Sequence, residues 1–153
     1  MTAGVRIGTV GEADLADLLP LMRGYADFYE VAPSDEDLLA LSRALIADPQ
    51  REGVQFIARR EADGTAIGFA TVYWLWSTTR ACRIGLMNDL FVAPEGRGTG
   101  TAEALIERCR AACRDHGVRR LTWRTALDNQ RAQKVYDRVG AVREQWLDYS
   151  LDA

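Results

Sequence analysis

The segment most suggestive of chemistry is a glycine-rich turn between an apolar stretch and an amphipathic one. It consists of Arg97, Gly98, Thr99, Gly100, Thr101 and Ala102. Glycines carry no β-carbon, so successive backbone amides can close around a phosphate, and the start of a following helix adds a favourable dipole. The turn therefore predicts a diphosphate site, although a plain loop that enters a helix has the same composition. The common nucleotide motifs fit worse, because the chain has no GxxxxGK[ST] and no full GxGxxG with a later acidic residue.

A second set of residues follows at a fixed spacing: Asn129, Ala132, Tyr136 and Gly140. Together with Leu90-Phe91-Val92, Glu95 and the turn at 97–102, this set resembles the two-part acetyl-CoA signature of the GNAT acetyltransferase family. The wider run Asn88 to Val92, and the C-terminal residues Trp146 and Tyr149, are similar to a subgroup of that family. This subgroup contains the diamine acetyltransferases and the yeast Hpa-type histone and amino-acid acetyltransferases.

The resemblance implies an α/β (α+β) fold, with a mixed and mostly antiparallel sheet flanked by helices. One parallel pair should splay apart, formed by the strand Met87 to Val92 and the strand Arg119 to Thr125. The pantetheine arm of acetyl-CoA would bind exposed backbone in the gap, and the diphosphate would rest on the glycine-rich turn. The implied cofactor-binding residues are Leu90, Phe91, Val92, Arg97, Gly98, Thr99, Gly100, Thr101, Ala102, Asn129, Ala132 and Tyr136. Asn129 has a second interpretation as a plain helix N-cap.

Acetyl transfer to an amine requires a base for the amine, a donor to the oxyanion, and an acid for the departing thiolate. Tyr136 lies at the position of the family's usual acid, and an ordinary tyrosine pKa of about 10 keeps it protonated at neutral pH. An aromatic residue that simply fills the core is the alternative. A backbone amide near Leu90 is the expected oxyanion donor.

The general base is harder to assign. Diamine acetyltransferases tend to carry a glutamate where this chain has Asn88, and an amide is no useful proton acceptor. Asp89 is the nearest carboxylate, but strand alternation places it on the opposite face from Asn88 unless a bulge intervenes. A water held by Asn88, Asp89 or Glu30 is equally compatible with the sequence.

The resemblance implies that the acceptor cleft lies beside the two N-terminal helices. Tyr25, Tyr29 and Glu30 would line a compact pocket there, and Asp89 would face it. Residues 1–50 hold nine Asp or Glu against three Arg, whereas residues 51–153 hold thirteen acids against sixteen bases. Solvated surface explains such a split equally well, but an acidic cleft favours a small cationic amine. Trp74 and Trp76 could add cation-π contacts, although tryptophans on a strand are more often core residues.

Periodicity along the chain predicts the order β α α β β β α β α β. Strands are expected at Val5 to Val10, Val54 to Arg59, Ala66 to Trp76, Cys82 to Val92 and Arg119 to Thr125, followed by a last extended segment after Gly140. Helices are expected from Glu12 to about Tyr29, from a Ser34 N-cap to near Asp48, through Leu105 to Cys113 with an end near Gly117, and from Asn129 to Arg138. Asp63-Gly64 predicts a hairpin turn.

Composition limits the class of protein. A chain of 153 residues, 48% of them hydrophobic, suits one domain. We expect a cytoplasmic location, since no apolar run is long enough for a membrane span and no signal segment is evident. Cys82, Cys109 and Cys113 lack metal-ligand spacing, so reduced, buried thiols are expected and no metal site. The net charge of −3 argues against general nucleic-acid binding.

The sequence thus predicts an acetyl-CoA-dependent N-acetyltransferase acting on a primary amine of a small molecule, such as a polyamine or an amino acid. Direct attack in a ternary complex needs no acetyl-enzyme. The candidate catalytic residues are Tyr136, Asn88 and Asp89, and the candidate substrate residues are Tyr29, Glu30 and Asp89. Two alternatives stay open: a protein lysine or N-terminal acetyltransferase, and a non-catalytic acyl-CoA-binding module. The resemblance also implies a homodimer.

Overall fold

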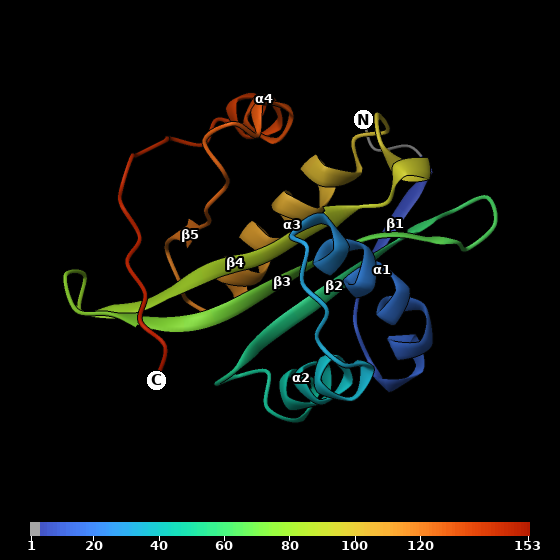
Figure 1. The fold of residues 1–153 in the computed structure, drawn as a ribbon, viewed down its shortest axis with the longest axis horizontal. Helices are drawn as coiled ribbons and strands as arrows, with labels where there is room; N and C mark the ends of the chain where they lie inside the picture. Colours follow the sequence, from blue (N-terminus) through green and yellow to red (C-terminus); the bar gives the residue numbers. More distant parts are fainter. Residues whose placement is uncertain (1–3) are drawn as a thin grey trace.

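The computed structural model describes residues 4–153, which form one mixed five-stranded sheet with helices on both faces (Figure 1). The strands lie in the order β1-β2-β3-β4-β5; the first four are antiparallel, and β4 and β5 are parallel. The strands are β1 Val5–Thr9, β2 Gly53–Arg60, β3 Ala66–Ser77, β4 Cys82–Val92 and β5 Leu121–Thr122. The α-helices are α1 Leu15–Phe28, α2 Asp35–Ala47, α3 Thr101–Asp115 and α4 Gln130–Arg138. Short 3-10 turns at Glu12–Asp14 and Pro94–Gly96 precede α1 and α3.

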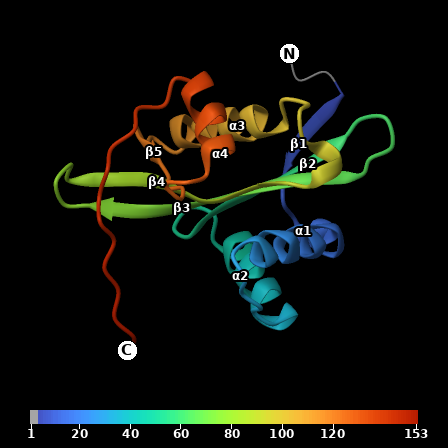
Figure 2. The same ribbon diagram turned by 45° about the horizontal axis from the view of Figure 1, so that its top comes forward.

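The helices divide into two layers. Figure 2 shows α1 and α2 on one face of the sheet and α3 and α4 on the other. One buried cluster lies under α3 and includes Phe56, Val72 and Leu105, and a second lies under α1 and includes Leu18 and Phe69. Burial of apolar surface on both faces is the main stabilising contribution, and it fixes which side chains of β3 and β4 point to which layer.

Local signals in the sequence explain several element boundaries. The Ser34 hydroxyl accepts a hydrogen bond from the Asp37 amide at 3.1 Å, which makes it the N-cap of α2 as predicted. Gly64 has a φ of 74° in the turn between β2 and β3, and the Asp63 carboxylate accepts from the Thr65 amide at 3.0 Å. The expected positions of the first four strands and all four helices are confirmed to within a few residues at their ends.

Two strand predictions are wrong in extent. The expected strand Arg119 to Thr125 pairs only at Leu121 and Thr122, because β5 moves away from β4 after two residues. The expected last strand does not form: residues 141–153 have no regular structure and run past the β3–β4 hairpin without joining the sheet (Figures 1 and 2). Residues 141–153 contain the apolar side chains that favour a strand, but a strand also needs the edge of a neighbouring strand to pair with.

Three further expectations are corrected or refined. Cys109 and Cys113 are buried free thiols as expected, but Cys82 is an exposed one at the start of β4. Trp74 is a core residue whose indole donates to the Pro49 carbonyl at 2.9 Å, whereas Trp76 is 72% exposed. Neither tryptophan faces the α1 layer with the site residues, since Trp74 belongs to the cluster under α3 and Trp76 has the same parity on β3.

No helix within residues 4–153 has the length and apolar character that a membrane crossing needs.

Gly85, where β4 first pairs with β5, is packed too tightly to accept a side chain. A β-carbon there would lie 2.7 Å from the Cys113 sulfur and 3.3 Å from Trp74 and Val72 atoms. We predict that Gly85→Ala lowers the free energy of unfolding by about 1–3 kcal/mol, measured by urea denaturation. Gly8→Ala is the matched control, because a β-carbon on that strand residue meets nothing within 4 Å. Equal stability of the two variants would contradict the packing.

Candidate active site

A bulge in β4 creates the centre of the site. Thr71 pairs with Asp89, but the next residue of β3, Val72, pairs with Met87, so Asn88 has no partner on β3. The extra residue interrupts the strand alternation that would have sent Asn88 and Asp89 to opposite faces. As a result, the Asn88 amide nitrogen donates to the Asp89 carboxylate at 2.9 Å. The bulge that would bring Asn88 and Asp89 to one face is therefore present.

Asp89 is a half-buried carboxyl on the α1 side of the sheet. Burial raises the pKa of Asp89, and the neighbouring polar groups of Thr71, Asn88 and Tyr25 oppose that rise. Among the described residues, no Arg or Lys acts on this pKa. A carboxylate that is partly desolvated and has no cationic partner holds a proton more tightly than an ordinary aspartate, which is the property a general base for an amine needs.

Aromatic residues from the end of α1 form one wall beside Asp89. The Tyr25 hydroxyl donates to the Asn88 carbonyl at 3.1 Å, and its ring contacts that of Tyr29 with centroids 5.0 Å apart. Burial, and then the charge of Asp89, raises the pKa of Tyr25, so this phenol stays protonated. Glu30 follows Tyr29 with a φ of 57°, in the left-handed region, and its side chain is exposed. The wall therefore ends in a carboxylate open to solvent.

Tyr136 enters the site from the opposite layer, on α4. Its ring packs edge-on against Trp123 with centroids 5.3 Å apart, and it is half-buried. Burial raises the pKa of Tyr136, and Tyr29 adds to the rise, so the phenol keeps its proton at neutral pH. Tyr136 thus packs against the core and also keeps a donatable proton, and the two interpretations of this residue are compatible.

Between these two walls lies the gap where β4 and β5 separate. The strands pair only at Gly85 with Leu121 and at Leu86 with Thr122, so β4 has no β5 partner from Met87 onward. The Val92 carbonyl accepts from the Arg97 Nε at 3.2 Å and therefore points away from β3. Because the backbone groups alternate along a strand, those of Leu90, two residues earlier, also point away from β3. Leu90 packs against the α3 cluster and Phe91 against the α1 cluster, so their side chains are structural.

The glycine-rich turn leads from this edge into α3. Gly98 and Gly100 have φ values of 75° and 78°, and a β-carbon on Gly98 would meet nothing within 4 Å. The Thr99 hydroxyl bonds to the Gly96 carbonyl at 2.5 Å and to the Thr101 hydroxyl at 2.7 Å, which stiffens the turn. The first amides of α3, from Thr101 and Ala102, have no carbonyl one turn earlier to bond. An open, stiff turn ahead of a helix N-terminus fits a phosphate-bearing group.

Asn129 lies at the start of α4. The Asn129 side-chain oxygen Oδ1 accepts from the Ala132 backbone amide at 3.2 Å, so Asn129 is the N-cap of α4. This cap uses only the oxygen, which leaves the amide nitrogen as a donor for a ligand. Within residues 4–153, no three His, Cys, Asp or Glu side chains gather as metal ligands would.

The structure adds residues that the sequence did not single out. Thr71 and Tyr73 share the Asp89 face of β3, and burial followed by the charge of Asp89 raises the pKa of Tyr73. Gln55 lies behind Thr71 and donates to its hydroxyl at 3.1 Å. Alternation along β2 and β3 indicates which residues share a face, but only the strand register places them opposite Asp89.

Comparison with known proteins agrees with this geometry. Residues 18–141 match the model of the acetyltransferase (GNAT) family. An uncharacterized N-acetyltransferase of Bacillus subtilis is 31% identical over 84% of this chain and 83% of its own. A thialysine N-epsilon-acetyltransferase of Caenorhabditis elegans is 26% identical over 95% of this chain and 91% of its own. A solved aminoglycoside N-acetyltransferase in complex with CoA superposes with a TM-score of 0.84, at 22% identity over 97% of this chain and 94% of its own.

The chain therefore belongs to the GNAT family of acetyltransferases.

The raised pKa of Asp89 has a consequence for stability. A carboxyl whose pKa is higher in the folded state binds more protons folded than unfolded, so it lowers stability as pH rises from its unfolded pKa through its folded one. We predict that Asp89→Asn is more stable than the wild type at pH 7, by a margin that shrinks toward pH 4. Urea denaturation at both pH values measures it, with the exposed Asp27→Asn as control. A variant less stable than the wild type at pH 7 would contradict the assignment of Asp89 as a partly desolvated carboxylate without a cationic partner.

Proposed function

We propose that this protein is an acetyl-CoA-dependent N-acetyltransferase that acetylates a primary amine of a small molecule by direct attack in a ternary complex. The observation that carries the proposal is Asp89, a carboxylate on the strand that loses its parallel neighbour, with no basic partner within residues 4–153. A half-buried acid of this kind is suited to accept the proton that an ammonium group must lose. Membership of the GNAT family supports the same chemistry.

The residues around the gap fit the cosubstrate. The open turn at 97–102 and the start of α3 would hold the diphosphate, and the outward backbone of Leu90 and Val92 would hold the pantetheine arm. Arg97 already lies at this edge through its hydrogen bond to the Val92 carbonyl. Acetyl-CoA bound there would supply an activated acetyl group and a thiolate leaving group.

The two proton transfers would use residues on opposite sides of the sheet. Asp89, on the α1 side, takes the proton of the attacking amine, with Asn88 and Thr71 holding its carboxylate. Tyr136, on α4, gives its phenolic proton to the thiolate. The effect of Tyr29 on the pKa of Tyr136 supports the proximity of the two walls.

Charge at the end of α1 supports a cationic acceptor. Asp35 contributes little to this charge, because it forms an ion pair with Arg23. Asp27 and Glu30 are exposed and, within residues 4–153, form no salt bridge with Arg, Lys or His. The named relatives act on amines, thialysine in one case and aminoglycosides in another. A small amine with a second cationic group suits these carboxylates.

An acceptor screen tests this function. Free thiol release from acetyl-CoA is measured with polyamines, amino acids, aminoglycosides, peptides and a lysine-rich folded protein. We expect release with one or more small amines and a preference for those with two cationic groups. Activity confined to the folded protein would identify a protein acetyltransferase instead. CoA binding with no release for any acceptor would identify a binding module.

Tyr136→Phe tests the acid directly, because it keeps the ring against Trp123 and removes only the hydroxyl. We predict that turnover falls by roughly 10²-fold while CoA affinity, measured by calorimetry, changes little. Tyr149→Phe is the control, since Tyr149 is 89% exposed and lies outside the site. Turnover near that of the wild type would leave Tyr136 with a packing role alone.

We also propose that the protein is a homodimer in which the C-terminal segment is covered by a second copy. Its large apolar side chains are all at least 80% exposed: Val142, Trp146, Leu147, Tyr149 and Leu151. A run of this kind on a lone chain is unusual and marks an interaction surface.

Light scattering of the purified chain tests the dimer. We predict that the wild type has twice the mass of one chain and that Trp146→Ser combined with Tyr149→Ser lowers it toward one. Leu127→Ser is the control, because Leu127 is 76% exposed on the loop before α4. A monomeric wild type would overturn the proposal.

A further inference from the structure

Behind Asp89 lies a line of buried polar groups that crosses the sheet beneath α1. Thr71 is directly opposite Asp89 in the β3–β4 register, so the two side chains are close neighbours on one face. Gln55 on β2 is opposite Thr71 in the β2–β3 register. Thr71 is 0% exposed and Gln55 3% exposed, and polar groups this deeply buried are costly unless they are paired.

The hydrogen bonds along this line donate in one direction, from Gln55 toward Asp89. The Gln55 amide nitrogen donates to the Thr71 hydroxyl oxygen at 3.1 Å, and this nitrogen can only donate. The hydroxyl has a single proton, and with its oxygen accepting from Gln55 that proton is free to point at the carboxylate of Asp89. Solvent does not compete for it, because Thr71 is fully buried.

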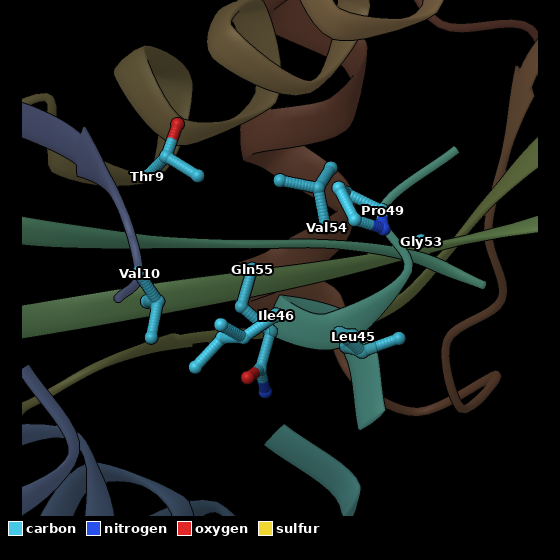
Figure 3. A pocket seen from close by; sticks show the side chains of 8 residues that line it. All are labelled: Thr9, Val10, Leu45, Ile46, Pro49, Gly53, Val54 and Gln55. Atoms are coloured by element: carbon cyan, nitrogen blue, oxygen red, sulfur yellow. The ribbon is translucent and has the colours of Figure 1, made fainter. Parts of the chain in front are cut away.

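The Gln55 amide is held in this orientation by its surroundings. Its nitrogen also lies 3.9 Å from the Met22 sulfur on α1, which accepts in turn from the Ser42 hydroxyl on α2 at 3.7 Å. The amide oxygen has no hydrogen-bond partner in the described part of the chain. It belongs to a residue lining a cavity between β2 and the end of α2, where Leu45 and Ile46 also lie (Figure 3). The reverse orientation would expose two donor hydrogens instead of one acceptor to these apolar side chains, which is less favourable.

We propose that Gln55 and Thr71 form a hydrogen-bond relay that orients the Asp89 carboxylate and favours its ionised form. This inference rests on the proposed function for its purpose, since only then is Asp89 the base. Both are positioning residues: Thr71 acts on Asp89, and Gln55 acts through Thr71. The remaining groups that face Asp89 are Asn88 from its own strand and the phenols of Tyr25 and Tyr73, which stay protonated.

The test is a carbon-13 NMR titration of the Asp89 carboxyl in the full chain without ligand, with the resonance assigned by its loss in Asp89→Asn. Thr71→Val keeps the shape of the side chain and removes the hydroxyl, so we expect the Asp89 pKa to rise above that of the wild type. Thr71→Ser keeps the hydroxyl and should restore the wild-type titration. Gln55→Met should also raise the Asp89 pKa, but by less than Thr71→Val does. In the Thr71→Val background it should have no effect, because Gln55 acts on Asp89 only through the Thr71 hydroxyl.

Two outcomes would overturn the relay: an unchanged Asp89 titration in Thr71→Val, or an equal shift in Thr71→Ser and Thr71→Val, which would indicate packing alone. If Thr71→Val does not fold, Gln55→Met decides, and an unchanged titration in it overturns the relay. Because no ligand is present, this result is independent of the acceptor screen. A chain that releases no thiol with any amine would contradict the proposed function and leave the relay standing.

Discussion

The bulge at Asn88 is the constraint on which the candidate active site depends. Without it, the regular pairing of β3 and β4 would put Asn88 and Asp89 on opposite faces of the sheet. With one residue added, both come to the same edge, and the Asn88 carbonyl also becomes the acceptor for Tyr25 of α1. A local irregularity in one strand therefore connects the carboxylate, its amide neighbour and the helix that walls the acceptor side. Bulges of this kind re-aim side chains beside functional sites in many sheets.

The second constraint is the early end of the parallel pair. β4 and β5 share only two residue pairs before they separate, and the close packing at Gly85 fixes where this happens. Below the sheet, α1 brings Tyr25 and Tyr29 to Asp89; above it, α4 brings Tyr136 to the same gap. The proposed base and acid thus come from different layers, and the cosubstrate would approach between them. Such an arrangement lets one carboxyl be partly desolvated while a phenol stays protonated, each through burial in its own layer.

How much of this the sequence predicts depends on whether a feature is local or requires long-range pairing. Ser34 and the Asp63-Gly64 turn act within a few residues, and both were predicted. The extent of β5 and the course of residues 141–153 depend on which edges are available for pairing, and these predictions were wrong. The two motifs located the turn at 97–102 and Tyr136 in the chain, while the roles of these residues remain predictions. Thr71 and Gln55 carry no motif, and only the strand register identifies them.

The central claim is that Asp89 removes the proton of the attacking amine, and the pH dependence of kcat/KM for Asp89→Asn tests it most directly. The measurement uses acetyl-CoA and the best acceptor of the screen, with Asp115→Asn as the control, because Asp115 is exposed at the C-terminal end of α3 and lies outside the site. If the claim is correct, Asp89→Asn loses roughly 10²-fold in kcat/KM near neutral pH and loses the rise in rate with pH that ionisation of Asp89 causes in the wild type. Retention of wild-type kcat/KM and of that rise in Asp89→Asn would contradict the account.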